Sequence, residues 1–315
     1  MLKYLGKRVL FGCLSIFLLV TIAFFLTRSM PGSPFQTSNV SDEVLEKMEE
    51  QYGLREPILI QYQTYLKNLL KGDMGISYQK PGLRVTDVIK NAFWPTAIVG
   101  GLATMTALIF GTGLGIWQAC SERSWVRHVL LLFTMFGTGI PNFVIASVSA
   151  LVFGVLFKML PISGLTGWQS YLLPVLSLSI YPMAVVTRMT ESSFSKEMKK
   201  EYVRLAKAKE LPEWKILFVH VLKNAWIPVL NYMGPTAAFL LTGSFVVESI
   251  FNIPGLGREF VNSIGNRDYT MILGLTTFMG IVVVVINILV DLLCAWLDPK
   301  IRLAYGKDAK YDTSI

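Results

Sequence analysis

Long uncharged stretches that recur along the chain dominate its pattern of hydrophobic and polar residues. A helix needs about 20 residues to cross the roughly 30 Å of hydrocarbon in a bilayer. Six stretches are apolar over most of that length, and polar or charged segments separate them. They are residues 9–27, 95–119, a stretch within 129–157, a stretch that runs from about 174 to 187 and beyond, 224–247 and 269–290. The pattern predicts an all-α integral membrane protein with six transmembrane helices.

Prolines and glycines modify this prediction at two of the stretches. The fourth stretch is the weakest, because Pro161, Pro174 and Pro182 interrupt it; neighbouring helices can satisfy the carbonyls that such prolines free. We expect Pro141 to bend the third helix. In the second stretch, Gly111 and Gly115 form a G-x-x-x-G pattern, which favours close packing of helices within the fold over a specific dimer face.

The first stretch follows a basic segment, as a secretory signal peptide does. It is nevertheless longer than a typical signal-peptide core, and the sequence Thr27-Arg28-Ser29 after it is not a small-x-small cleavage site. We therefore expect an uncleaved membrane anchor.

The distribution of basic residues predicts the orientation of the chain. The net charge is +8, from 29 Lys and Arg against 21 Asp and Glu. If the N-terminus is cytoplasmic, the cytoplasmic segments hold 18 basic residues and the short opposite loops hold three. Cytoplasmic loops carry such an excess. The sequence thus predicts a multi-pass protein of the cytoplasmic membrane with both termini inside, and lipid rather than nucleic acid explains its basic character.

One long polar segment, residues 28–90, carries eight basic and eight acidic residues and does not report on orientation. Helix signals begin at Ser41 and stop at Gly53, and begin again at Pro57 and stop at Gly72. We expect an extracytoplasmic helical segment that caps the membrane body. The predicted organisation is a first helix in 1–27, this segment in 28–90, a permease-like core in 91–298 with a cytoplasmic loop at 188–223, and a cytoplasmic tail in 299–315.

Motifs for catalysis are absent from the sequence. It contains no H-E-x-x-H, no G-x-S-x-G and no phosphate-binding G-x-x-x-x-G-K-[ST]. A secondary transporter should show repeat symmetry and carboxylates at the membrane midplane, and neither is evident, since Glu248 and Asp291 fall near the ends of stretches. We predict no enzyme activity, no catalytic residue, and no cofactor or metal on this chain, so that any energy comes from another chain.

The loop at 201–212 is the most informative cytoplasmic segment. Helical spacing places Tyr202, Leu205 and Ala206 along one side, basic residues surround them, and Leu211-Pro212 ends the helix. From periodicity alone, an interfacial helix attracted to anionic lipid is the preferred interpretation.

With His220 to Ala225 and Pro228 downstream, this loop resembles the EAA loop of binding-protein-dependent ABC importer permeases. The resemblance implies a coupling helix that docks into a groove of the ATPase subunit, formed by Arg204, Leu205, Ala206, Lys207, Ala208, Lys209 and Glu210. We expect the small side chains of Ala206 and Ala208 to contact that groove. Glu210 stands where the family has glycine, which adopts positive φ freely, whereas glutamate does so at a cost.

Further motifs resemble the oligopeptide, dipeptide and nickel permeases, specifically the first of their two permease subunits. The resemblance runs nearly end to end, although Cys294 stands where an aromatic residue is expected. The motifs are Met30 to Pro34, Tyr52-Gly53-Leu54 with Gln61-Tyr62, Gly72 to Ser77, Gly243 to Glu248 with Phe251 and Pro254 to Gly257, Arg267-Asp268-Tyr269, and Asp291 with Asp298 to Ile301.

This resemblance implies a permease that imports di- or oligopeptides by alternating access, with nickel or metal chelates and glutathione as alternative cargo. Its implied partners are a second permease subunit, two ATPase subunits that bind ATP and Mg²⁺, and an extracytoplasmic solute-binding protein. A minority interpretation assigns an outer gate or a binding-protein contact to Glu248, Pro254, Gly255, Gly257 and Arg258. We favour turn chemistry for this segment, with the two glycines supplying unusual φ, and interface anchoring for Glu248 and Arg258.

Overall fold

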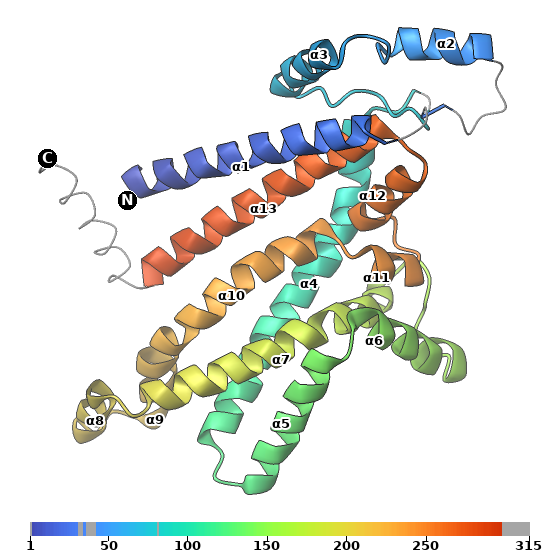
Figure 1. The fold of residues 1–315 in the computed structure, drawn as a ribbon. Coiled ribbons are helices and arrows are strands. Elements are labelled where there is room, and N and C mark those ends of the chain that lie inside the picture. Colours follow the sequence, from blue (N-terminus) through green and yellow to red (C-terminus); the bar gives the residue numbers. More distant parts are fainter. Residues whose placement is uncertain (1, 31–33, 36–41, 81, 298–315) are drawn as a thin grey trace, which may run out of the picture.

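The fold is a bundle of long helices with short helices at both ends (Figure 1). The computed structural model describes residues 2–30, 34–35, 42–80 and 82–297. The α-helices are α1 (Leu2–Arg28), α2 (Asp42–Gln51), α3 (Ile58–Leu70), α4 (Val85–Cys120), α5 (Ser124–Gly139), α6 (Asn142–Ser149), α7 (Leu172–Glu197), α8 (Glu201–Ala208), α9 (Glu213–Lys215), α10 (Leu222–Thr242), α11 (Phe245–Ile250), α12 (Leu256–Gly265) and α13 (Tyr269–Leu297). Two π-helical segments, Ala150–Leu156 and Ile216–Val221, and a 3₁₀ turn, Trp168–Tyr171, complete the secondary structure of the described residues.

Short helices lie at both ends of the bundle. In Figure 1, α2 and α3 lie across one end of the bundle, and α8 and α9 lie at the other. We call these the cap end and the α8 end. Among the described residues, five helices are long and apolar enough to cross a membrane, and a bent pair makes a sixth if it forms one span. The prediction of six spans is therefore consistent with the structure.

The bent pair is the third span, and its shape confirms the effect expected of Pro141. Helices α5 and α6 meet at an angle of 103°. Pro141 precedes the first residue of α6 and cannot donate the backbone hydrogen bond that would continue α5. The span starts at Ser124, earlier than expected, and α6 turns aside at the end of α5.

Two other boundaries differ from the prediction. Helix α4 begins at Val85, and Pro95 lies inside it rather than at its start, so the polar segment at the cap end stops before residue 90. In the fifth span, helix α10 ends at Thr242, because Gly243 adopts φ +96°, which no helix can continue. Residues 245–247 lie in the separate short helix α11, and the apolar span at Glu213–Ile250 includes them, as predicted.

The centre of the bundle is the packing of α4 against α7. Helix α7, the predicted weak span, is the most buried of the apolar helices. Gly111 and Gly115 of α4 face it at close range: a Cβ atom on Gly115 would lie 2.7 Å from the Thr187 carbonyl oxygen, and one on Gly111 would lie 2.8 Å from Val186 Cβ. This confirms the prediction that the G-x-x-x-G pattern serves packing inside the fold.

The two helices predicted in the polar segment are present as α2 and α3. Helix α3 is held on α1 and α13 by tyrosines: Tyr62 Oη lies 2.7 Å from Thr21 Oγ1, and Tyr65 Oη lies 3.2 Å from Thr277 Oγ1. The Phe24 ring packs between these two tyrosines. The cap is thus attached to the first and last long helices.

Candidate functional site

Helix α8 rests on an apolar platform built by its own chain. Val203 is 1% exposed and Ala206 is 7% exposed. Both pack in one cluster with Phe194 of α7, Val221 before α10 and Ala225 of α10, among other residues. The burial of one side fixes which face of α8 is turned outward.

The outward face consists of Arg204, Leu205, Lys207, Ala208, Lys209 and Glu210. The Leu205 side chain is 59% exposed. The structure corrects the expected role of Ala206, whose methyl group packs inside this chain and is not free to enter a partner's groove. The reason is rotational: residues 203 and 206 lie on one face of the helix, and 204, 205 and 208 lie on the others. Ala208 is exposed, and its expected contact stays a prediction.

Hydrogen bonds join α8 to both neighbouring long helices. Tyr202 donates its hydroxyl hydrogen to Glu197 Oε2 at 2.8 Å, at the end of α7, and accepts a hydrogen bond from Asn224 Nδ2 at 3.3 Å, at the start of α10. Burial raises the pKa of Tyr202, and the nearby Glu197 carboxylate raises it further, so the phenol stays neutral and keeps its hydrogen for this bond. A displacement of α8 therefore acts on α7 and α10 together.

Helix α8 ends in a Schellman motif with glutamate in the left-handed position. The Leu211 N–H donates to the Ala206 carbonyl at 3.3 Å, and the Glu210 N–H donates to the Lys207 carbonyl at 2.9 Å. Glu210 adopts φ +53°. The backbone at position 210 thus takes the conformation that glycine adopts most easily. The turn is made at Glu210 itself and not at Leu211-Pro212.

Glu210→Gly is expected to stabilise the end of α8 by about 1 kcal/mol, because glycine enters the left-handed region without the clash of a Cβ atom. A rise in the melting temperature of the purified protein would show this, with Lys209→Gly as the control, since Lys209 has negative φ. A lower melting temperature for Glu210→Gly would show that the Glu210 side chain has a stabilising contact of its own.

At the cap end, Glu248 joins three helices through its buried carboxylate. The side chain belongs to α11 and is 4% exposed. Its Oε1 accepts a hydrogen bond from Thr96 of α4 at 2.8 Å, and its Oε2 accepts one from the backbone N–H of Arg258 in the first turn of α12 at 2.8 Å. Thr96 Oγ1 in turn accepts the Leu256 N–H at 2.8 Å. We call these four residues the outer hub.

Gly255 and Gly257 are glycines because the outer hub leaves no room for a Cβ atom at either position. This corrects the expectation that they supply unusual φ. Gly255 has φ −105°, and Gly257 lies in the first turn of α12. A Cβ atom on Gly255 would collide with the Glu248 carboxylate and Thr96, and one on Gly257 would lie 2.8 Å from the Phe245 backbone nitrogen. In this segment Gly243 takes positive φ instead.

The remaining residues assigned to an outer gate lie at the surface of the hub. Pro254 is exposed. The Arg258 guanidinium donates to Asn252 Oδ1 at 2.6 Å and Asn252 donates to Ser163 Oγ at 3.2 Å. This arrangement anchors the hub to the loop between the π-helical segment Ala150–Leu156 and the 3₁₀ turn Trp168–Tyr171, in agreement with the preferred interpretation of Glu248 and Arg258 as anchors.

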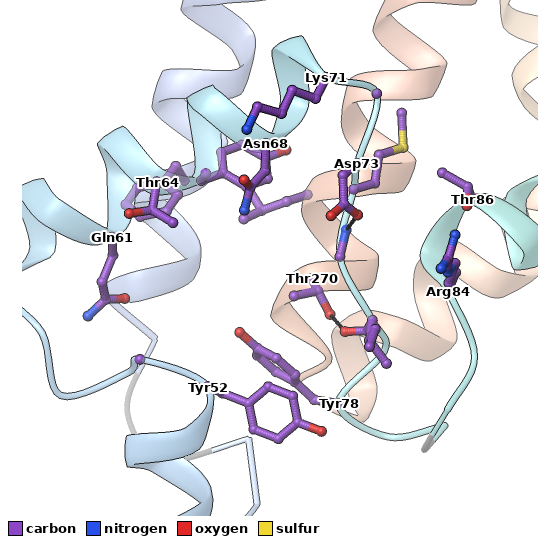
Figure 2. Close-up of a pocket in the computed structure, with 18 of the residues that line it drawn as sticks. Tyr52, Gln61, Thr64, Asn68, Lys71, Asp73, Tyr78, Arg84, Thr86 and Thr270 are labelled. Atoms are coloured by element: carbon purple, nitrogen blue, oxygen red, sulfur yellow. Dashed lines mark hydrogen bonds between the residues drawn. The ribbon is translucent and has the colours of Figure 1, made fainter.

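A polar cavity of about 670 Å³ lies between the cap and the long helices. Figure 2 shows Gln61, Thr64 and Asn68 of α3 along one wall, opposite the extended segment that contains Asp73. Burial raises the pKa of Tyr78 at its base, and the positive charge of Arg28 opposes this shift. The cavity combines cationic, acidic and amide groups, so its charge alone selects no ligand.

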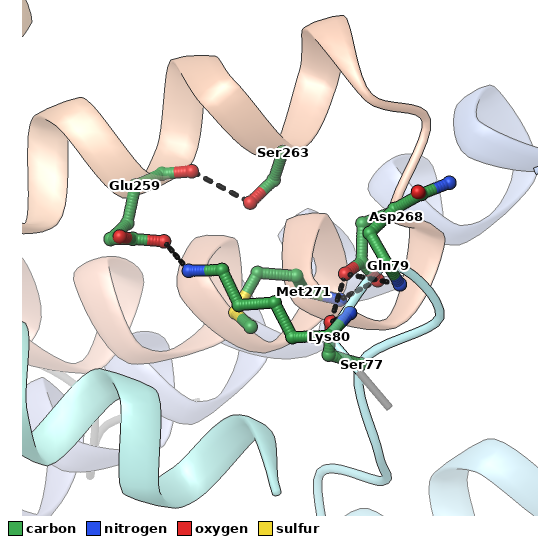
Figure 3. Close-up of polar contacts among 7 residues, drawn as sticks. All are labelled: Ser77, Gln79, Lys80, Glu259, Ser263, Asp268 and Met271. Carbon is green, nitrogen blue, oxygen red and sulfur yellow. Dashed lines mark hydrogen bonds and ion pairs between the residues drawn. The ribbon is translucent and has the colours of Figure 1, made fainter. Parts of the chain in front are cut away.

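Asp268 connects the same extended segment to α13 (Figure 3). Its carboxylate accepts the hydroxyl hydrogen of Ser77 and the backbone N–H of Met271, the latter at 3.2 Å. Lys80 adds an ion pair with Glu259 of α12 at 2.6 Å. Asp268 therefore acts as the N-cap of α13 and as a further attachment point of the cap, beside Tyr62 and Tyr65.

Sequence reasoning assigned no role to Thr96 or to Asp268. An aspartate directly before a long apolar run is an N-cap signal and could have identified Asp268. No sequence signal identifies Thr96, because its partner Glu248 is 152 positions away. The C-terminal motif at 298–301 lies outside the described residues. Among the residues that the structure describes, no cluster of His, Cys, Asp or Glu side chains could hold a metal ion.

Comparison with known proteins places these features in a family. The chain matches the family "Binding-protein-dependent transport system inner membrane component" over residues 111–303 and its N-terminal part over residues 1–96. It is 39% identical to the oligopeptide transport system permease protein OppB of Haemophilus influenzae over 305 residues, covering 96% of this chain and 100% of that protein. It is 36% identical to the dipeptide transport system permease protein DppB of Bacillus subtilis, covering 96% and 99%.

Solved structures agree on the fold. An inward-facing MetNI methionine ABC transporter has a chain that aligns with a TM-score of 0.54 at 15% identity, covering 68% of this chain and 97% of its own. A chain of an amino acid ABC transporter aligns with a TM-score of 0.52, covering 67% and 94%. At such identity the likeness concerns the fold alone, whereas the sequence matches cover 96% of the chain: the protein belongs to the family of inner membrane components of binding-protein-dependent transport systems.

Proposed function

We propose that this chain is a permease subunit of an ABC importer for di- or oligopeptides. The nearly full-length similarity to oligopeptide and dipeptide permeases supports this cargo over nickel or metal chelates and glutathione. In this proposal the chain pairs with a second permease subunit, receives cargo from an extracytoplasmic binding protein at the cap end, and contains no ATPase site. Two partner ATPase subunits bind ATP and Mg²⁺ at the α8 end, which is cytoplasmic together with both termini.

The observation that carries the proposal is the construction of α8. One face is buried on a platform of α7 and α10, and the other carries the exposed Leu205 among basic residues. An interfacial lipid helix needs no such platform, whereas a helix that transmits force needs a rigid attachment to what it moves.

The structure offers a route for that force. Nucleotide binding in the ATPases shifts the position of α8, and the Tyr202 hydrogen bonds and the Ala206 contacts pass the shift to α7 and α10. Both helices contain prolines at which they can bend, Pro182 in α7 and Pro228 and Pro235 in α10. Alternation between two arrangements of these helices then opens the path first to one side and then to the other.

Leu205→Asp is expected to abolish copurification of the ATPase subunits and peptide-stimulated ATP hydrolysis, because it places a charge in the centre of the proposed interface without touching the platform. Affinity purification of the complex and ATPase assays in proteoliposomes measure both effects. Ala206→Trp is a poorer test, since it also disrupts the buried platform.

The matched control is Leu59→Asp, the same substitution at a residue of α3 that is 63% exposed at the cap end. It should leave the ATPase subunits bound. If Leu205→Asp retains the ATPase subunits and full coupled hydrolysis, α8 is not the coupling helix.

A further inference from the structure

The polar cavity between the cap and the long helices lies at the level of the phospholipid headgroups. The apolar part of α1, Leu5–Arg28, has 24 residues, so it is about 36 Å long and exceeds the hydrocarbon core of a bilayer by roughly 6 Å. Its last turn therefore reaches the headgroup region. Phe24 and Arg28 near this end line the cavity, together with Leu273 of α13. At about 670 Å³, the cavity has the size of a small-molecule site.

Helix α3, one wall of the cavity, lies beside the last turns of α1 (Figure 1). Tyr62 of α3 reaches Thr21, which lies about 10 Å inside the end of α1. One face of α3 is polar and lines the cavity. Apolar side chains outside that face are exposed, with Leu70 88% exposed, and they adjoin the exposed Leu26 on the lipid-facing surface of α1. An amphipathic helix in this position lies in the membrane interface, so lipid borders the cavity.

Arg28 contributes a positive charge that no carboxylate compensates within the described part of the chain. Its guanidinium lies 5.4 Å from the centre of the Phe24 ring and 5.5 Å from that of Tyr269. Its buried Nε has no hydrogen-bond partner among the described residues, and the ion pairs formed there do not include it. Lys71 and Arg84 also line the cavity. The group that matches such donors is an anion with several oxygens, such as a phosphate.

Gln61 makes the opposite demand on a ligand. Its Nε2 donates to the carbonyls of Leu54 at 3.0 Å and Glu56 at 2.7 Å, which fixes the orientation of the amide. The buried Oε1 has no partner in the described part of the chain, and Figure 2 shows it turned toward the cavity. The carboxylates of Glu56 and Asp73 also belong to the lining. The cavity therefore offers acceptors for a cation with N–H groups as well as donors for a phosphate.

We propose that this cavity is a binding site for the headgroup of a phospholipid with a primary ammonium group, phosphatidylethanolamine, from the leaflet at the cap end. Arg28, Lys71 and Arg84 bind its phosphate. Gln61 Oε1 and the nearby carboxylates accept hydrogen bonds from its ammonium group, and its acyl chains lie against the apolar surfaces of α1 and α3. The bound lipid joins α1, α3 and α13 and holds the cap on the membrane body. The site is independent of the cargo that the protein transports.

Phosphatidylcholine provides the sharpest comparison, because it has the same phosphate and net charge but no N–H on its nitrogen. Native mass spectrometry of the complete purified complex, titrated with each lipid, measures their affinities. Phosphatidylethanolamine should bind about tenfold more tightly, since phosphatidylcholine leaves the Gln61 oxygen unpaired. Equal binding of the two lipids would overturn the proposal. Soluble phosphoethanolamine, which lacks acyl chains, should not displace the lipid at equal concentration; if it does, the site binds free phosphate esters instead.

Two substitutions locate the lipid in this cavity. Arg28→Gln should lower the affinity for phosphatidylethanolamine about tenfold, and Lys71→Gln, at an exposed side chain that disturbs the fold least, about threefold. The matched control is Lys67→Gln, which removes an exposed charge from α3 outside the cavity lining and should bind the lipid as the wild type does. Equal affinities of Lys71→Gln and Lys67→Gln would refute the site. Release of the lipid on addition of the binding protein would assign the cavity to that partner instead.

Discussion

Gly115→Leu is expected to prevent folding of the bundle. A Cβ atom at this position would already lie 2.6 Å from Thr190 Cβ and 2.7 Å from the Thr187 carbonyl oxygen, at the interface of α4 and α7. Overpacking of a tight interface costs about 3 kcal/mol, which is a large part of the stability of a typical domain, and leucine adds three further carbon atoms beyond Cβ. The yield of monodisperse protein in detergent and its melting temperature measure the effect.

Gly113→Leu is the matched control on the same helix. Apart from its chain neighbours and the nearby backbone of α4 itself, no atom of the described residues lies within 4 Å of a Cβ atom built on Gly113. The substitution should leave the yield and melting temperature of the isolated chain close to those of the wild type. If Gly115→Leu behaves like Gly113→Leu, the close approach of α4 and α7 does not hold in the protein.

Glu248→Ala is expected to destabilise the cap end by about 3 kcal/mol or more. The substitution removes the acceptor of the Thr96 hydroxyl and of the Arg258 N–H, and each buried donor left unpaired costs about 1–3 kcal/mol. It also opens a cavity where the side chain is now buried. The melting temperature should fall, and protease cleavage between α11 and α12 should become faster.

Glu248→Gln should show a smaller loss, because one oxygen remains to accept a hydrogen bond while the amide group faces a donor. Glu213→Ala serves as the control, since it removes a carboxylate from an exposed position at the α8 end. If Glu248→Ala melts as the wild type does, the outer hub is not a stabilising element, and a direct role of Glu248 in gating becomes the better interpretation.

The sequence predicted the helical segments well because membrane insertion depends on local hydrophobicity. The average hydropathy of about 20 neighbouring residues decides whether a segment crosses a bilayer, so the positions of the spans follow from neighbours alone. The bend at Pro141 and the packing of Gly111 and Gly115 were predictable for the same reason, since both follow from the local chemistry of a single residue type.

The candidate site was less predictable, because its contacts join distant parts of the chain. The pattern of α8 showed an amphipathic helix, but only the packing of Val203 and Ala206 on α7 and α10 revealed which face points outward. The family glycine replaced by Glu210 was noticed in the sequence, yet its positive φ could be established only from the backbone.

Composition and local pattern by themselves determined that this chain is a helical membrane protein with six passes, a polar cap between the first two and a short amphipathic helix before the fifth. Only the tertiary structure decided that Glu248 meets Thr96 and that Arg28 and Gln61 line the same cavity. The physical reason is that insertion into a membrane sums the properties of adjacent residues, whereas a buried hydrogen bond or a cavity depends on which helices pack side by side and in which rotation.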